Sequence, residues 1–507
     1  MNIKDAKQEI SHALRAYHEK DELGNYCYPL VRQRPILLMG PPGIGKTAIM
    51  EQIAKENDVG LVAYTITHHT RQSAVGLPRI REKIYDGQPA TVTEYTMSEI
   101  IDSVYACMER TGKREGILFI DEINCASETL APTMLQFLQN KTFGSHKIPE
   151  GWMIVAAGNP PEYNKSVREF DIVTLDRIRR IDIDVDCEAW MEYAWNHEIH
   201  GAILSYLNIR KDSFYLIRNN AEGKFFVTAR GWEDLSQILK SYERLQIPVT
   251  EQLVVQFLQE EETAKSFTAY YQLYMKYGQD YGIPEILEHQ MDEKMRRQKT
   301  EMAKAGSFEE RFTVTGLVLS YLNTSFGQYC KREKQIQTLH QALKYFKEYQ
   351  PDGDMTVFYD FIQERKNSLK VKWDAQLISM IEYQVEKWVI AKLEEYQLEV
   401  KKEHLTEREI GFEKIKELFQ KELMERKNGI LHVKDQLAQA FGFLEECFGD
   451  GQEMVLFMTE LSKNEKAMEF IADHGCEPYF KYSDRLLFRQ RKEQLQGSIQ
   501  ELLDGEV

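Results

Sequence analysis

The sequence lacks any long apolar run. No stretch of the 507 residues approaches the roughly 18–20 consecutive apolar residues that a membrane-spanning helix needs. The first residues, M-N-I-K-D-A-K-Q-E-I, are polar and lack the apolar core of a secretory signal. The sequence therefore predicts a cytoplasmic protein with no membrane partner.

Cysteine is also scarce, with 7 residues scattered along the chain and never paired as C-x-x-C. An odd number at irregular spacing suits neither a disulfide framework nor a zinc site, so we expect reduced cysteines, most of them in the core. Two histidine pairs, His68-His69 and His197/His200, have no third metal ligand at a useful spacing. They are predicted to be loop and helix-surface histidines rather than metal ligands.

Positively charged residues are outnumbered, because the chain has 64 Lys and Arg against 80 Asp and Glu, which gives a net charge of −16. Nonspecific binding to nucleic acid or to an anionic membrane needs a positive field, so this balance argues against both. A local basic patch is still compatible with it. The composition is that of an ordinary globular protein, and the length allows about two to four domains, each with its own core.

What the sequence does contain is a glycine-rich phosphate-binding pattern. Residues 36–47 read I-L-L-M-G-P-P-G-I-G-K-T, an apolar strand that runs into G-x-x-x-x-G-K-T and then a helix. In this pattern backbone N–H groups, left uncovered by Gly43 and Gly45, turn toward the phosphates of a nucleoside triphosphate. Lys46 adds a positive charge near the β- and γ-phosphates, and the Thr47 hydroxyl is a ligand for Mg²⁺. The positive end of the following helix faces the same anion. The predicted nucleotide-binding residues are Gly40, Pro41, Pro42, Gly43, Ile44, Gly45, Lys46, Thr47 and Ala48.

A second motif, G-I-L-F-I-D-E-I-N at residues 116–124, fits the first. A short unbroken apolar run of this kind suits a parallel strand that is buried on both faces. Two carboxylates at its end then lie where open α/β sheets bind their ligands. Asp121 is predicted to hold Mg²⁺ together with Thr47, and Glu122 to act as the general base that polarises the attacking water. The alternative is an acidic helix cap after a strand, but the phosphate loop upstream favours the catalytic interpretation.

The rest of the first 187 residues alternates between strand and helix patterns. Further strands are predicted at 61–66, 152–157 and 181–186, and helices in the first 35 residues, at 98–110 and near 128–139. Strands separated by helical segments indicate an α/β fold, with a parallel sheet covered by helices on both faces.

The remainder of the chain is predicted to be helical. One irregular stretch is expected at 219–227, and after residue 275 the sequence is rich in Glu, Lys, Gln and Leu to its end. Helix breaks are predicted at 278–284, 305–307, 351–354 and 449–451. No heptad run is long enough for an extended coiled coil.

Two further polar residues each have two interpretations. Asn159 ends the strand predicted next to the second motif, where it could bind the attacking water or the γ-phosphate. It could equally be a turn-forming residue before Pro160-Pro161. Arg177, in the sequence L-D-R-I, could be a cation supplied across a subunit boundary or an ordinary surface arginine. The residues alone leave both questions open.

With these residues together, the chain resembles AAA+ ATPases of the MoxR type, within the broader group that shares dynein-like ATP-binding modules. The resemblance implies that Asn159 is sensor 1 and that Arg177 is the finger that contacts a neighbouring subunit's γ-phosphate. It also implies that Arg230 is sensor 2, at the start of a lid helix. Arg179 and Arg180 stand close enough to Arg177 that either could be the finger instead. Five motifs in family order carry the resemblance, at 40–47, 117–124, 156–160 (A-A-G-N-P), 175–178 (L-D-R-I) and 228–232 (T-A-R-G-W).

The chain departs from this pattern in one place. In proteins of the MoxR type D-E-I-N is usually followed by R-A, whereas here Cys125-Ala126 follows, which puts an intersubunit contact of that arginine in doubt. The G-L-P sequence at 76–78 also looks like the loop that precedes the second motif in this group. Residues 284–507 contain no motif that matches, so the resemblance implies nothing about them.

The resemblance predicts three domains: an AAA+ nucleotide-binding domain at 1–187, a helical lid at 188–283 and a helical C-terminal domain at 284–507. It implies a Mg²⁺-dependent ATPase whose subunits associate head-to-tail into a ring, with a hexamer expected. This machine would remodel a protein partner, for example one that carries a von Willebrand factor A domain. Two alternatives are an ATP-dependent assembly switch with negligible turnover, disfavoured by Glu122, and a nucleotide-driven nucleic-acid restriction motor, disfavoured by the acidic charge.

Overall fold

The computed structural model describes residues 1–485, apart from His69 and residues 86–87, 144–145, 164–166, 168–169, 221–222, 350–353 and 375–376. The chain divides into two compact units. The first comprises Met1–Trp190, Phe214–Asp234 and Phe257–Gln259. The second comprises Met191–Ser213, Leu235–Gln256 and the chain from Glu260 onward. The division into three domains at residues 187 and 283 stays a prediction.

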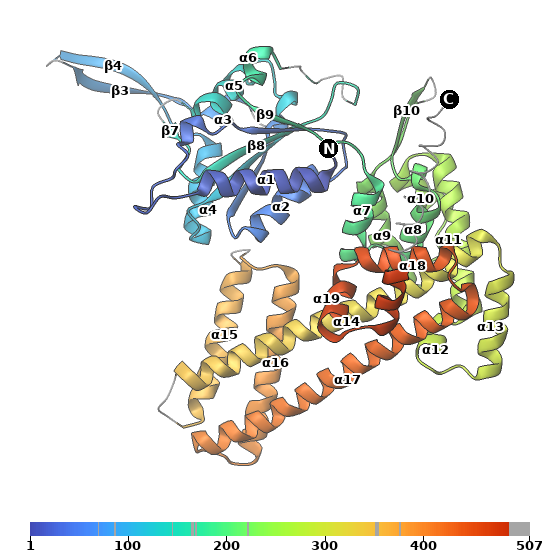
Figure 1. Cartoon of the computed structure of the whole chain (residues 1–507). Coiled ribbons are helices and arrows are strands. Elements are labelled where there is room, and N and C mark those ends of the chain that lie inside the picture. Colours follow the sequence, from blue (N-terminus) through green and yellow to red (C-terminus); the bar gives the residue numbers. More distant parts are fainter. Residues whose placement is uncertain are drawn as a thin grey trace, which may run out of the picture. The chain divides into compact units, whose positions relative to one another are not determined.

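The first unit is built on a five-stranded sheet (Figure 1). Its strands lie in the order β2 (Gly60–Thr65), β5 (Gly116–Asp121), β8 (Trp152–Gly158), β1 (Ile36–Met39) and β9 (Arg179–Asp182). Every neighbouring pair is parallel, which confirms the predicted α/β fold. All five carboxyl ends therefore meet at one edge of the sheet. The strand expected at 181–186 is displaced, because β9 pairs with β1 only over residues 179–182.

Helices cover both faces of this sheet. Because side chains alternate along a strand, Ile36 and Leu38 point into one core and Leu37 into the other. The first core is completed by α1 (Ile3–His18) and α2 (Lys46–Glu56), and the second by α4 (Glu99–Thr111) and α5 (Ala131–Asn140). The strands are buried on both sides, as a sheet covered by helices on both faces requires. Short helices in the connections of this unit are η1 (Leu30–Arg32), η2 (Ile66–His68), α3 (Arg71–Val75), η3 (Ile123–Cys125) and α6 (Ile172–Leu175), and η4 (Lys211–Ser213) belongs to the second unit.

Three antiparallel hairpins were not expected from the sequence. They are β3 (Pro78–Tyr85) with β4 (Gln88–Tyr95), β6 (Thr142–Phe143) with β7 (His146–Lys147), and β10 (Leu216–Asn220) with β11 (Gly223–Val227). The irregular stretch predicted at 219–227 is therefore wrong. It belongs to a hairpin because β-branched and aromatic residues on both strands favour pairing, as where Ile217 lies opposite Phe226. The β3–β4 hairpin projects from the sheet (Figure 1).

The second unit is formed by helices, which confirms the predicted all-α C-terminal region. The helix breaks expected at 305–307 and 449–451 are confirmed. The break expected at 278–284 consists of one residue, Gly282, between the helix that ends at Tyr281 and the helix that begins at Ile283. Of the helix break expected at 351–354, residues 351–353 lie outside the described residues. The boundaries between the two sets of residues fall within α7 (Cys187–Asn196), α9 (Ala229–Leu245) and α10 (Glu251–Leu258). The others are α8 (Gly201–Ile209), α11 (Glu261–Tyr281), α12 (Ile283–Leu287), α13 (Glu293–Ala305), α14 (Phe308–Tyr349), α15 (Thr356–Asp374), α16 (Met380–Lys402), α17 (Arg408–Phe448), α18 (Gln452–Lys463) and α19 (Glu465–His474).

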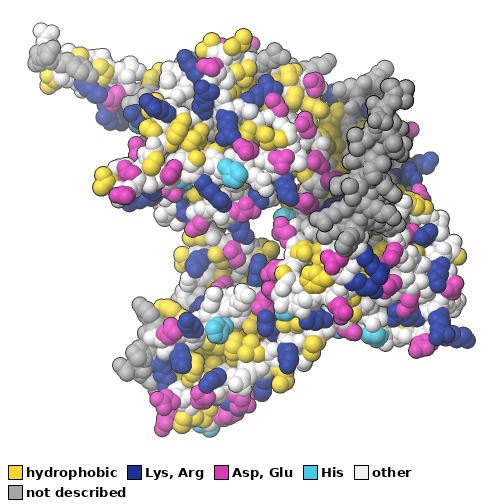
Figure 2. Space-filling view, in the orientation of Figure 1, with side chains coloured by type: hydrophobic (Ala, Val, Ile, Leu, Met, Phe, Trp, Pro, Cys, Tyr) yellow, Lys and Arg dark blue, Asp and Glu magenta, His cyan; other side chains and the backbone are white. Residues whose placement is uncertain are grey.

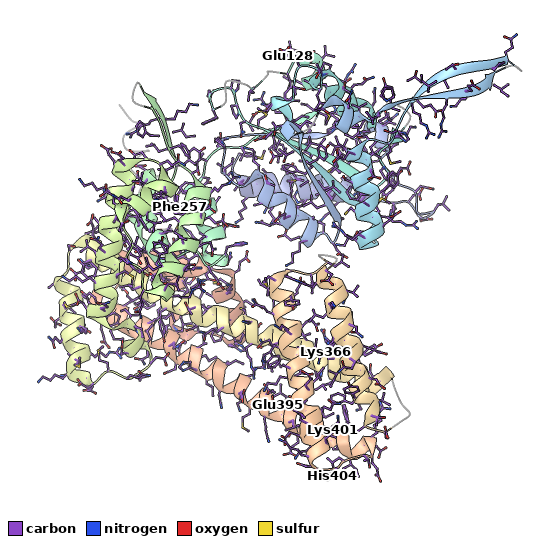
Figure 3. The ribbon with its side chains drawn as sticks, turned by 180° about the vertical axis from the view of Figure 1, so that it is seen from behind. Glu128, Phe257, Lys366, Glu395, Lys401 and His404 are labelled. Atoms are coloured by element: carbon purple, nitrogen blue, oxygen red, sulfur yellow. The ribbon has the colours of Figure 1, made fainter. Side chains whose placement is uncertain are left out.

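Two helices of about forty residues organise this unit. α14 has 42 residues and α17 has 41, and they pack against each other. Beside them α15 and α16 run side by side, and Figure 3 labels Lys366 on the first and Lys401 on the second. Lys366 is paired with Glu394 of α16, and Lys401 lies over the Tyr359 ring of α15. In the part of the chain that the structure describes, no helix is both long and apolar enough to span a membrane.

Candidate functional site

The predicted phosphate-binding loop lies between β1 and α2, at the carboxyl edge of the sheet. Gly43 and Gly45 have φ values of 73° and 95°, in the left-handed region that glycine adopts without a steric penalty. Gly40 is constrained differently, since a Cβ there would lie 2.8 Å from the Ile183 carbonyl oxygen. α2 begins at Lys46, directly after Gly45 of the loop, where the sequence predicts a helix. The N-terminus of this helix therefore faces the loop, as an anion-binding site requires.

Lys46 is buried within the loop. Its Nζ donates to Gly40 O at 2.8 Å, to Pro41 O at 2.7 Å and to Asn159 Oδ1 at 2.9 Å. Burial lowers the pKa of Lys46 to about 8, and nearby Arg230 lowers it too, whereas Asp121 acts in the opposite direction. An ammonium group held in this way is only weakly compensated by carbonyl oxygens, so an anionic ligand would stabilise its charged form strongly.

Asp121 ends β5 and lies beside Thr47. The Thr47 hydroxyl donates to Asp121 Oδ2 at 2.9 Å, and the Glu122 amide donates to Asp121 Oδ1 at 2.9 Å. The chain thus brings together a hydroxyl and a carboxylate oxygen, both hard ligands that suit Mg²⁺. Among the described residues there is no cluster of three or more His, Cys, Asp or Glu that could form a metal cage. These two protein ligands fit Mg²⁺, because Mg²⁺ in proteins often has one or two protein ligands while phosphate oxygens and water complete its coordination shell.

Glu122 has an unusual backbone conformation. Its φ of 56° and ψ of 33° lie in the left-handed region, which costs a residue with a Cβ about 1–2 kcal/mol. Backbone strain of this kind is concentrated at functional sites, where surrounding structure maintains it. The Thr67 hydroxyl, just beyond β2, donates to Glu122 Oε2 at 2.8 Å. This bond fixes one carboxylate oxygen and leaves the other able to accept a proton.

Asn159 stands at the end of β8, next to Lys46. Its backbone oxygen accepts a hydrogen bond from Asn124 Nδ2 at 2.8 Å, so a buried side chain of the second motif links β5 to β8. Gly158 permits this contact, because a Cβ there would lie 2.6 Å from Asn124 Oδ1. The structure therefore brings Lys46, Thr47, Asp121, Glu122 and Asn159 to one edge of the sheet.

A distant segment of the same unit also reaches the loop. The Tyr215 hydroxyl donates to Pro42 O at 2.9 Å, and the Arg230 amide donates to Gly43 O at 3.2 Å. A Cβ on Gly43 would lie 2.9 Å from Thr228 Cβ. The Arg230 side chain is exposed and close enough to Lys46 to lower its pKa, so the structure places this predicted residue at the site.

Arg177, the predicted finger, is exposed. The partner that the structure gives its guanidinium is Gln139 of α5, within the same unit. Arg179 pairs with Glu9 and Arg180 with Asp182, so both neighbours of the predicted finger have intramolecular carboxylate partners. Two strongly exposed apolar residues, Ile172 and Val173, lie on α6, which ends two residues before Arg177.

Of the two predicted histidine pairs, the structure describes the side chains of His197 and His200. His197 stacks on Tyr193 with ring centroids 3.9 Å apart, and buried His200 caps α8 and contacts Glu243 at 2.9 Å. His69 lies outside the described residues. His200 is thus a buried structural residue rather than the helix-surface histidine that was predicted.

Three residues of the site were missed from the sequence. Thr67 follows the strand predicted at 61–66, so the rule that collected Asp121 and Asn159 at strand ends could have found it. Asn124 was quoted in the second motif but given no role. Nothing in the sequence indicates that Tyr215 belongs to the site, because it lies 173 positions from Pro42 in the chain.

Part of this unit is similar to a known protein family. Residues 35–178 match the family described as AAA domain (dynein-related subfamily). The match includes the phosphate loop, Asp121, Glu122, Asn159 and Arg177, and ends before Tyr215. It supports an AAA+ domain that binds nucleotide, and with the parallel sheet it confirms the predicted P-loop fold. No curated protein sequence matches the chain.

Proposed function

We propose that the protein is a Mg²⁺-dependent ATPase of the MoxR type that forms a head-to-tail ring and uses ATP hydrolysis to remodel a protein partner. The observation that carries the ATPase proposal is the convergence of Lys46, Asp121 and Glu122 at the carboxyl edge of the sheet, where only β8 separates β1 from β5. The match to a dynein-related AAA domain supports the same conclusion.

Each residue has a role that its position supports. Lys46 would exchange its carbonyl partners for phosphate oxygens, which are far stronger acceptors for an ammonium group. Asn159, bonded to Lys46 at 2.9 Å, would orient the terminal phosphate or the attacking water. Glu122 would take the proton of that water on the carboxylate oxygen that Thr67 leaves open. Mg²⁺, when bound by Thr47, Asp121 and phosphate oxygens, would neutralise charge on the transferred phosphoryl group.

The trans role of Arg177 rests on its exposure and on the hydrogen bond of its guanidinium to Gln139, which is not a residue of the unit's own site. Together with exposed Ile172 and Val173, it forms a surface suited to a neighbouring copy. Head-to-tail contact of this kind is heterologous and closes into a ring when the rotation permits. A von Willebrand factor A domain on the partner and a hexameric ring are part of the same proposal and rest on the resemblance alone.

The alternative functions are less well supported. A pure assembly switch has no use for a strained, hydrogen-bonded general base such as Glu122. On the face that Figure 2 shows, Lys and Arg are interspersed with Asp and Glu, a distribution that does not favour a nucleic-acid motor.

Two variants test the proposal. Lys46→Ala should abolish tight ATP binding, because it removes the cation inside the loop. Glu122→Gln should bind ATP normally but stall hydrolysis, because the amide keeps the shape and loses the base. Calorimetry and phosphate release separate the two effects. Glu109→Gln, the same change at an exposed acid on α4, should leave both measurements unchanged. Wild-type turnover in Glu122→Gln, or unchanged affinity in Lys46→Ala, contradicts the assignment.

A further inference from the structure

The phosphate loop offers few backbone amides to a ligand at its start. Gly40 N donates to Gly158 O at 3.4 Å, and Pro41 and Pro42 have no N–H. The first amides that the loop can turn toward a phosphate therefore belong to Gly43 and Ile44. The loop sequence alone does not determine the direction in which these two N–H groups point.

A peptide unit is planar and trans, so its C=O and N–H point in opposite directions. No cis peptide occurs in the part of the chain that the structure describes. The Pro42 carbonyl shares a plane with the Gly43 amide, and the Gly43 carbonyl shares one with the Ile44 amide. A partner that holds either carbonyl on one side of the loop therefore directs the next amide to the opposite side.

Both carbonyls are held by the segment 214–232. The Tyr215 hydroxyl donates to Pro42 O at 2.9 Å, and the Arg230 amide, in the first turn of α9, donates to Gly43 O at 3.2 Å. We propose that Tyr215 is a positioning residue of the nucleotide site, which acts with the Arg230 amide to turn the Gly43 and Ile44 amides toward the phosphates. This inference rests on the proposed nucleotide binding.

The two contacts are tied to each other. Buried Trp232 donates through Nε1 to Phe214 O at 3.0 Å, and Phe214 adjoins Tyr215 in the chain. The Thr228 hydroxyl accepts from Gly231 N at 3.2 Å and so fixes the first turn of α9, which carries the Arg230 amide. The hydrogen bond between Trp232 and Phe214 therefore links the two segments that carry the donors.

The phenol is suited to this task. Its ring packs against the core that α1 and α2 form on the sheet, which fixes the position of its hydroxyl. Burial, and to a lesser extent Tyr163, raises the pKa of Tyr215, so the hydroxyl stays protonated and remains a donor throughout the neutral and moderately alkaline range.

Tyr215→Phe tests the proposal, because it keeps the packed ring and removes only the donor. A neutral hydrogen bond that orders a loop is worth about a two- to tenfold change in affinity. We expect Kd and KM for ATP to rise by about that factor with kcat unchanged, since the contact acts on ground state and transition state alike. Inorganic tripolyphosphate, which has the phosphates but no base, should lose affinity by the same factor.

Tyr17→Phe is the matched control. Tyr17 packs against the same core, and its hydroxyl donates to a backbone carbonyl, Arg34 O, at 3.3 Å, before β1 rather than in the loop. This variant should bind ATP and tripolyphosphate as the wild type does. A loss for ATP without a loss for tripolyphosphate would mean that Tyr215 contacts the base, and would overturn the proposal. A lower kcat at unchanged KM would also overturn it.

Amide hydrogen exchange separates this inference from the proposed function. Without nucleotide, the peptide covering residues 40–47 should exchange faster in Tyr215→Phe than in the wild type or in Tyr17→Phe. If the wild type binds no nucleotide, the proposed function fails, but faster loop exchange would still show that Tyr215 holds the loop. Equal exchange in all three proteins refutes the positioning role.

Discussion

The low pKa of Lys46 leads to a specific pH dependence of ATP binding. Burial lowers this pKa to about 8, from an ordinary value of 10.5, with Asp121 opposing the change and Arg230 adding to it. A triphosphate would replace carbonyl oxygens with anionic ones and so raise the pKa again. ATP therefore binds the protonated form, and above pH 8 binding must include uptake of a proton. Affinity should fall as the pH rises through this pKa.

The magnitude follows from the protonated fraction. With a pKa of about 8, roughly nine-tenths of Lys46 is protonated at pH 7 and about one-tenth at pH 9. The Kd for ATP should therefore rise about tenfold over this range, equivalent to about 1.4 kcal/mol. Calorimetry in buffers of different ionisation enthalpy should detect uptake of roughly three-quarters of a proton at pH 8.5, and little at pH 7.

Lys46→Arg is the control for this experiment. A guanidinium keeps its charge across the whole range, so its affinity, whatever its absolute value, should not change between pH 7 and 9 through this group. Any pH dependence that both proteins share then belongs to ATP, Mg²⁺ or other residues. An equally flat profile in the wild type, with no proton uptake at pH 8.5, would refute the reasoning that Lys46 is desolvated before the ligand arrives.

Three further outcomes are expected. Arg177→Ala should bind ATP normally but lose about 10³–10⁵ in turnover, and mixing it with Glu122→Gln should restore part of the activity; no recovery in demonstrably mixed rings counts against a trans finger. Thr67→Val should lower kcat about tenfold with little change in Kd, because it frees the general base from its hydrogen bond; unchanged phosphate release would exclude that role. A chain that ends near residue 283 should aggregate on expression, because it loses α14, against which buried α8 packs; a soluble product that binds ATP would show that the remaining helices fold without it.

The parts of this protein that could be predicted are those in which local sequence determines local structure. A short apolar run followed by G-P-P-G-I-G-K-T allows few backbone conformations, so strand, loop and helix appear where expected, with α2 beginning at Lys46. The strand at 116–121 was predicted for the same reason, because a fully apolar run next to two carboxylates suits the interior of a parallel sheet. The helix break at 449–451 begins at Gly449, whose φ of 57° lies in the region that glycine adopts without a steric penalty.

The parts that could not be predicted depend on contacts between distant segments. The sequence predicts an irregular stretch at 219–227 where the structure has the hairpin of β10 and β11, because five-residue strands have no periodicity that distinguishes them from a loop. That hairpin begins directly after Tyr215, whose hydroxyl bonds Pro42. The loop motif fixes which amides can meet a phosphate, but the direction of these amides depends on a segment more than 170 residues away. A motif can therefore identify a phosphate loop, whereas the affinity of that loop is set in part by residues that no motif contains.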